Sequence, residues 1–216
     1  KVVEDCAHAL GGKHKGQPLG SFGDVAFFSR DHSKITSTFL GGMATTNNID
    51  LAKKIEKIQS RSPFLPRNLQ RKLMLGFILE FPLYSAYTYW FGRLVMAILN
   101  RLGVVFYWRD ELLRSKPNRY PYPARLSAQQ ALLGISQLKQ LDDNILHRRK
   151  LFKEINNNLK LNHLDFSESA CLRYSFYVKN RAQFEALFQS RWDLGIWFTS
   201  IAQGKNENLE EIGYIS

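Results

Sequence analysis

The chain has few cysteines, and the two that it has are not placed for shared chemistry. Cys6 and Cys171 are the only ones in 216 residues, and neither belongs to a CxxC pair or to a Cys/His cluster with metal-ligand spacing. A zinc site and a disulfide framework are therefore both unsupported. We interpret the two residues as free thiols of a protein in a reducing compartment.

Long uncharged runs are also missing. The longest run without a charged side chain in the most apolar part of the chain covers twelve residues, 81–92, short of the roughly 18–20 that span a bilayer. The opening KVVEDCAHAL has acids where a signal peptide would have its apolar core. We therefore expect a cytoplasmic protein.

Because the sequence starts directly in a strand and ends without a closing helix, we also expect a fragment that lacks an N-terminal part.

Acidic residues are scarce relative to basic ones. There are 30 Lys and Arg against 19 Asp and Glu, a net charge of +11. Such a charge favours anionic partners, namely nucleic acid, an acidic membrane surface or phosphate-bearing small molecules. No nucleic-acid-binding motif of the usual spacing is present, so we do not expect nucleic acid as a partner.

The first sixty residues show alternating strand and helix signals. Val2 and Val3 begin a short strand, VAFFS (25–29) is a second and GGMATT (41–46) a third, with a glycine-rich loop or hairpin after the first. IDLAKKIEKIQSR (49–61) has apolar residues at helical spacing, and Asn48 or Asp50 could cap its start. This alternation predicts an α/β layer structure.

Residues 62–123 are strongly apolar and aromatic. The spacing of Leu94, Val95, Ile98, Leu99 and Leu102 puts them on one face of a helix. A buried helical hairpin or a subunit interface is one interpretation. The alternative is a pair of helices that rests on a membrane, with a peripheral contact through residues 73–108, which the basic charge and the Trp and Tyr content favour.

The last third predicts a long helix followed by a small α/β unit. Ser127 caps a helix from about Ala128 to Leu159. A strand is expected at Leu172–Val178, a helix at Ala182–Gln189, and a further segment at LGIWF (194–198). The expected apolar stripe of the long helix consists of Ala131, Ile135, Leu138, Leu141, Ile145, Phe152, Ile155 and Leu159.

Four polar side chains follow the first two strands. Asp5 ends the first strand and His8 comes three residues later; Ser29 ends the second strand and Lys34 comes five residues later. Taken singly, each has an ordinary explanation, such as a turn acceptor or a solvent-exposed lysine. The carboxyl ends of strands in open α/β sheets collect ligands. Together, an acid, an imidazole, a hydroxyl and an amine are what pyridoxal phosphate requires.

The motifs EDCAHALGG, FGDVAFFS, the SK pair at Ser33-Lys34 and GGM resemble the signature of the DegT/DnrJ/EryC1/StrS family. RLSAQQALLGISQLKQLDDNILHRRKLF (125–152) resembles a later helix of the same family. The resemblance covers about residues 1–60 and 120–200. It implies the fold-type I fold of pyridoxal-phosphate aminotransferases: the end of the large domain (1–61), an apolar helical insertion (62–123), and a long helix with a small, incomplete C-terminal α/β domain (124–216).

The resemblance also implies roles for the four side chains. Lys34 would form the Schiff base with pyridoxal 5'-phosphate, and Asp5 would pair with the pyridinium nitrogen. His8 would lie against the ring, and Ser29 would bind the phosphate. The implied reaction converts a nucleotide-linked keto-sugar to an amino-sugar with a donor such as glutamate, for amino-sugar and polysaccharide biosynthesis, in a homodimer.

The chain departs from the family pattern in three places. Phe39-Leu40-Gly41-Gly42 stands where the family reads GEGG, Pro123 stands where an asparagine is usual, and the apolar segment 62–123 is additional. These departures keep alternatives open: a non-catalytic or membrane-associated homologue, or a pyridoxal-phosphate-dependent sugar dehydratase. Dehydratase relatives tend to replace the lysine with histidine, so Lys34 argues against the last.

Overall fold

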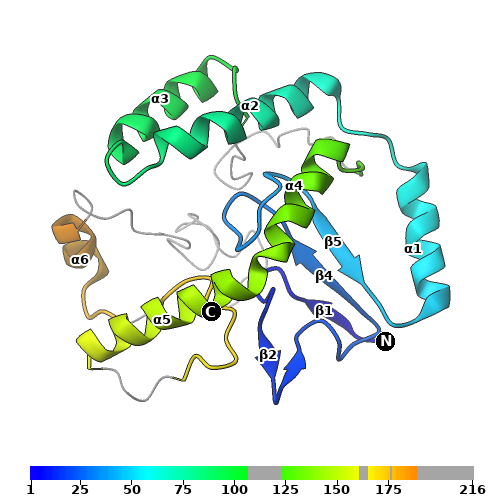
Figure 1. Ribbon diagram of the computed structural model, residues 1–216, viewed down its shortest axis with the longest axis horizontal. Coiled ribbons are helices and arrows are strands. Elements are labelled where there is room, and N and C mark those ends of the chain that lie inside the picture. Colours follow the sequence, from blue (N-terminus) through cyan, green and yellow to red (C-terminus); the bar gives the residue numbers. More distant parts are fainter. Residues whose placement is uncertain (107–122, 161–164, 176, 189–216) are drawn as a thin grey trace, which may run out of the picture. The chain divides into compact units, whose positions relative to one another are not determined.

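The computed structural model describes residues 1–106, 123–160, 165–175 and 177–188 (Figure 1). The chain divides into two compact units. The larger comprises residues 1–107 and 121–174, and the smaller comprises 108–120 and 175–216. All the site residues predicted from the sequence lie in the larger unit.

A three-stranded sheet forms the start of the larger unit. Its order is β1 (Val3–Asp5), β4 (Val25–Ser29) and β5 (Gly42–Thr45), with β1 parallel and β5 antiparallel to β4 (Figure 1). The short strands β2 (Lys13–His14) and β3 (Gln17–Pro18) form a separate hairpin. The strands expected at 25–29 and 41–46, the hairpin and the mixed α/β class are thus confirmed.

The two faces of the sheet differ in character. Ala26 and Phe28 alternate with Phe27 along β4 and are buried with Cys6 in a small core, whereas Phe27 is exposed. A buried-face contact holds the loop before β4: the Glu4 carboxylate accepts hydrogen bonds from the backbone N–H groups of Gly20, Phe22 and Gly23. These bonds lower the pKa of Glu4, most strongly the one from Gly23.

Helix α1 (Ile49–Arg61) begins where the sequence indicated. The Asn48 side chain accepts the Leu51 N–H at 3.0 Å, which confirms it as the N-cap. No residue of α1 is buried, although its apolar residues recur at helical spacing. Ile49 and Ile58 are exposed.

Helices α2 (Arg67–Leu83) and α3 (Tyr89–Arg101) form a helical hairpin (Figure 1). The Thr88 hydroxyl donates to the Leu83 carbonyl at 2.9 Å and closes the turn. Gly92 and Met96 are the buried residues of α3. Among the helices that the structure describes, none is both long and apolar enough to cross a bilayer.

The apolar face of α3 expected from the sequence is not buried within the hairpin, so of the interpretations left open only that of a buried hairpin is wrong for this face. Leu94, Ile98 and Leu102 are exposed instead of packed. The apolar residues do share one face of α3, as expected. The hairpin, however, packs through Gly92, whose missing side chain permits close approach of α2. The apolar face is therefore left on the outside.

The expected single helix from 128 to 159 is two helices, which corrects that prediction. Helix α4 (Ala128–Lys139) and helix α5 (Leu141–Asn158) meet at Gln140, whose N–H bonds to the Gln137 and Leu138 carbonyls in a tight turn. The Ser127 cap is confirmed as a capping box with Gln130. The break lets Ile145 pack with Ile35 and Ala170.

Only part of the expected apolar stripe is buried. Ile145 and Phe152 of α5 are buried, but Ile135 and Leu138 of α4 are exposed. The buried residues of α4 are Gln130 and Gly134, because α4 meets its neighbour through hydrogen bonds and not through its apolar face.

The strand expected at Leu172–Val178 does not form in the described residues of that range. The backbone at the start of this range bonds to a side chain instead, since Arg148 donates to the Leu172 carbonyl at 3.5 Å. In the smaller unit α6 spans Arg181–Phe188, which agrees with the predicted helix up to Phe188. Gln189 and the LGIWF segment lie outside the described residues.

Candidate functional site

The lysine loop, residues 30–41, connects β4 to β5 and carries Lys34. Backbone bonds close its base: the Arg30 N–H donates to Gly41, and the Thr38 N–H donates to Arg30 at 2.9 Å. The Thr38 hydroxyl donates to the Leu40 carbonyl at 2.8 Å. Hydrogen bonds within the loop therefore hold its backbone.

Two glutamines of α4 hold one side of this loop. The Gln130 carboxamide donates to the Thr38 carbonyl at 2.9 Å. Gln137 makes a paired contact: its oxygen accepts the Ser37 N–H at 2.8 Å, and its nitrogen donates to the Ser37 carbonyl at 2.6 Å. Buried backbone groups that would otherwise lack partners are satisfied in this way.

Helix α2 holds the other side of the loop. Phe39 and Leu40 are buried with Leu65 and Leu73, and Phe77 meets the Phe39 ring edge-on at 5.8 Å. Phe39 and Leu40 thus share a core with α2 and with the residue that precedes it, Leu65. Phe39 keeps a φ of +66°, a conformation that glycine adopts more readily than other residues.

An imidazole–carboxylate pair adds a polar contact between the loop and α2. His32 Nε2 lies 2.8 Å from Glu80 Oε1. The hydrogen bond to Glu80 raises the pKa of His32, against the opposing effect of burial. Helix α2 is therefore joined to the lysine loop by both apolar packing and a polar contact.

Lys34 is half-buried, and its backbone N–H donates to the Asp31 carbonyl at 3.1 Å. Burial is the main cause of a lowered pKa for its amine. Arg173 lowers this pKa further, while Asp31 and Asp5 oppose the shift. A larger fraction of the amine is consequently unprotonated near neutral pH than for an exposed lysine.

Asp5 and His8 lie within electrostatic range of Lys34. Burial lowers the pKa of His8, Lys34 and Arg173 lower it further, and Asp5 raises it. Asp5 Oδ1 accepts the Ala7 N–H at 3.0 Å at the end of β1. The structure thus brings together three of the four side chains that the sequence singled out.

Arg173 is the charged neighbour that sequence reasoning missed. It acts on both Lys34 and His8. It comes from an irregular segment 139 residues after Lys34, and no local motif marks it. Only the packing of residues 165–174 against the start of the chain places it there, as when Glu168 accepts the Lys13 N–H at 2.8 Å.

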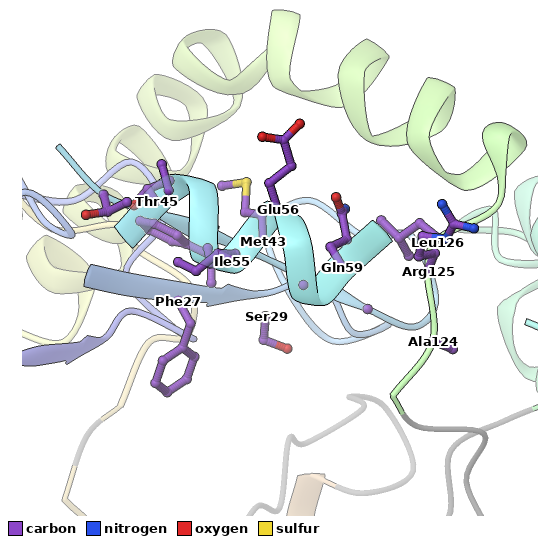
Figure 2. A pocket seen from close by; sticks show the side chains of 16 residues that line it. Phe27, Ser29, Met43, Thr45, Ile55, Glu56, Gln59, Ala124, Arg125 and Leu126 are labelled. Atoms are coloured by element: carbon purple, nitrogen blue, oxygen red, sulfur yellow. The ribbon is translucent and has the colours of Figure 1, made fainter. Parts of the chain in front are cut away.

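Ser29 ends β4 and its hydroxyl accepts the Asp31 N–H at 3.3 Å. It lines a groove of about 1000 Å³ that also involves β5, α1 and Ala124–Leu126. Figure 2 shows Ser29 and Phe27 pointing to the same side of β4, away from Ile55 and Glu56 of α1. A hydroxyl is therefore available at the carboxyl end of the strand next to that of Asp5.

The fold of most of the chain resembles that of a solved protein. A DegT DnrJ EryC1 StrS aminotransferase from Brucella abortus superposes with a TM-score of 0.54 at 21% identity, covering 87% of this chain and 39% of that chain. Residues 1–77 match the model of the DegT/DnrJ/EryC1/StrS aminotransferase family. The family resemblance predicted from the sequence is thereby confirmed.

Curated relatives carry sugar and cyclitol aminotransferase names. L-glutamine:2-deoxy-scyllo-inosose aminotransferase of Streptoalloteichus tenebrarius is 44% identical over 59 residues, which are 27% of this chain and 14% of the relative. UDP-4-amino-4,6-dideoxy-N-acetyl-beta-L-altrosamine transaminase of Campylobacter jejuni is 25% identical over 202 residues, covering 88% of this chain. The chain spans 42% of the length of that second relative.

Proposed function

We propose that this chain supplies the lysine-bearing part of a pyridoxal-phosphate-dependent aminotransferase of fold type I, which acts on a nucleotide-linked keto-sugar. The observation that carries the proposal is Lys34 itself. Its amine has a lowered pKa and lies in electrostatic range of Asp5 and His8, on a loop held from two sides.

The chemistry of these residues fits the cofactor. Lys34 Nζ would hold the aldehyde carbon, and the Asp5 carboxylate would pair with the ring nitrogen. His8 would lie against the ring, and the Ser29 hydroxyl would donate to the phosphate. When bound, pyridoxal phosphate supplies the electron sink for a C–H bond broken next to an amine.

Lys34 would also move the proton. A desolvated amine with a lowered pKa accepts a proton near neutral pH. Once the amino donor has displaced it from the aldehyde carbon, Nζ would take the proton from Cα of the donor and pass it to the cofactor. In the second half-reaction Nζ would move a proton in the opposite direction, to the carbon of the sugar that receives the amine. Arg173 adds positive charge beside the amine and favours its neutral form.

The identity of the substrates rests on the relatives. Their names join aminotransferase chemistry to sugars and to UDP- or GDP-linked compounds, which supports a nucleotide-sugar acceptor and an amino-acid donor such as glutamate. The homodimer and the cytoplasmic location belong to the same proposal.

Borohydride reduction of the intact protein tests the role of Lys34. With pyridoxal phosphate added, reduction should leave the cofactor attached to the peptide that contains Lys34, as read by mass spectrometry. Lys34→Ala should lose this label entirely, whereas Lys54→Ala, an exposed lysine of α1, should keep it. Absence of label in the unaltered protein would favour a non-catalytic homologue.

A second measurement separates transamination from dehydration. Glutamate and nucleotide-linked keto-sugars are incubated with the protein, and the products are identified. An amino-sugar together with 2-oxoglutarate supports the proposal. A deoxy-sugar without consumption of glutamate contradicts it and supports the dehydratase alternative.

A further inference from the structure

The α2–α3 hairpin is apolar on two sides. Its inner residues, among them Leu73, Gly92 and Met96, are buried. Large apolar side chains also cover the outside. These exposed residues are Leu75, Ile78 and Phe81 of α2, Tyr87 of the turn, and Trp90, Phe91, Leu94, Ile98 and Leu102 at α3. Phe81 is 87% and Tyr87 100% exposed, so this is more than the scattered surface residues of an ordinary protein.

The exposed residues lie at helical spacing. On α3, Trp90, Leu94 and Ile98 follow one another at intervals of four residues, away from Gly92 and Met96. On α2, Leu75 and Ile78 lie on the opposite side of the helix from Leu73 and Glu80, which face the lysine loop. Each helix therefore has one apolar face that packs inside the larger unit and a second apolar face that is exposed.

The charges of this hairpin are predominantly basic. Residues 62–106 contain five basic side chains, Arg67, Arg71, Lys72, Arg93 and Arg101, and one acidic side chain, Glu80. That acid contacts His32 of the lysine loop. Arg93 lies over the Trp90 ring, 5.5 Å from its centroid. Aromatic and basic side chains together are typical of helices that rest at a lipid headgroup layer.

We propose that the α2–α3 hairpin lies on an anionic phospholipid surface, with its exposed apolar side chains at the acyl boundary and its arginines among the phosphates. A second copy of the same hairpin fits less well, since two hairpins that each carry a net positive charge would repel each other. The helices are not long enough to span, so they would lie in the plane of the surface.

Binding of the hairpin to a bilayer would also set the position of the lysine loop relative to that bilayer. The inner side of α2 contacts this loop through Phe77 and Glu80. A hairpin resting on a bilayer would therefore hold the loop beside that bilayer. The proposal does not depend on the proposed enzyme activity, because vesicle binding can be measured without cofactor or substrate.

Vesicle co-sedimentation of the intact protein tests the proposal. The protein should bind vesicles of equal parts phosphatidylserine and phosphatidylcholine, and bind pure phosphatidylcholine more weakly. The double substitution Leu94→Glu with Ile98→Glu should lower the partition coefficient roughly tenfold or more. Arg101→Gln should lower it about fivefold, and added salt should remove this difference.

Leu132→Glu is the matched control. Leu132 is 67% exposed on α4, so the substitution adds one negative charge, half that of the double variant, to an exposed apolar site of another helix and should leave binding unchanged. Unfolding curves should show that every variant folds. No binding by the unaltered protein, equal loss with Leu132→Glu, or full binding by the double variant would overturn the proposal. So would a dimer that dissociates in the double variant while vesicle binding persists.

Discussion

Two threonines of the lysine loop are equally buried but differ in their hydrogen bonds. Thr36 and Thr38 are each 1% exposed. The Thr38 hydroxyl donates to Leu40, whereas the Thr36 hydroxyl has no partner in the described part of the chain. A buried hydroxyl without a partner lowers stability, and one that is bonded contributes to it.

We therefore expect opposite effects from the same substitution. Thr36→Val keeps the shape and removes the unsatisfied hydroxyl, so the free energy of unfolding should stay equal or rise by about 1 kcal/mol. Thr38→Val should lower it by about 1 kcal/mol or more. Urea unfolding measures both. A loss for Thr36→Val as large as that for Thr38→Val would show that the Thr36 hydroxyl is bonded in the folded protein.

The contact between His32 and Glu80 predicts a dependence of stability on pH. The raised pKa of His32 means that folding favours the protonated ring. This stabilisation is complete below the unfolded value of about 6.5 and is lost as pH rises through the raised folded value. Asp31, on the same loop, acts in the same direction.

Glu80→Gln tests that dependence. The difference in unfolding free energy between the unaltered protein and the variant should be largest near pH 6, where it should reach at most about 1 kcal/mol for a partly exposed pair. It should shrink as the pH rises above the folded pKa of His32. A difference that is constant from pH 5.5 to 8.5 would mean that Glu80 acts through packing alone.

At the scale of elements, two glycines of the helical hairpin face different surroundings. A side-chain carbon at Gly92 would overlap the Leu83 carbonyl, because α2 and α3 meet there. One at Gly76 would meet Phe39 and Val105 at 3.9 Å, which is ordinary contact. Both lie inside helices, where alanine is otherwise preferred to glycine.

Alanine should therefore separate the two positions. Gly92→Ala should lower the free energy of unfolding by about 1–3 kcal/mol, since the hairpin must open to admit the methyl group. Gly76→Ala should be neutral or raise it by up to about 1 kcal/mol. Thermal unfolding by circular dichroism measures both. Equal effects at the two positions would mean that α3 does not pack on α2 through Gly92.

Local patterns were enough to predict some elements and not others. β4, α1 and the caps at Asn48 and Ser127 depend on neighbours in sequence, so periodicity and capping residues indicate them. Burial depends on distant partners. The apolar face of α3 is exposed because the hairpin packs through Gly92, and α4 and α5 separate at Gln140 because α4 is held by hydrogen bonds to the lysine loop.

In the candidate site, too, features set by sequence neighbours were predicted and features set by distant residues were not. Asp5, His8, Ser29 and Lys34 were found from strand ends and from a family signature. Their chemical roles and the domain boundaries stay predictions. Arg173 was not found, because it reaches Lys34 only through tertiary packing. Phe39 and Leu40 were recognised as departures from the family, but their packing on α2 required the structure.

At the scale of the whole chain, the two cysteines report on opposite ends of the larger unit. Cys6 is 3% and Cys171 1% exposed, and burial raises the pKa of the Cys6 thiol. The two segments are joined by Glu168. Its backbone carbonyl accepts the Lys13 N–H, and its carboxylate accepts those of Lys15 and Gly16. If this unit unfolds as one body, both thiols become reactive in the same opening event.

Thiol labelling followed by peptide mass spectrometry tests that cooperativity. In native buffer both cysteines should be labelled at one slow rate, about a thousandfold or more below the unfolded rate, as expected for an unfolding free energy of about 5 kcal/mol. Glu168→Ala should speed labelling of Cys171 while Cys6 keeps its rate, because the substitution removes two of the three hydrogen bonds by which Glu168 holds residues 165–171 to the β2–β3 hairpin but leaves β1 in its sheet. Faster labelling of Cys171 than of Cys6 in the unaltered protein would show that the two ends open separately, and that the segment bringing Arg173 to Lys34 is held less firmly than the end of β1.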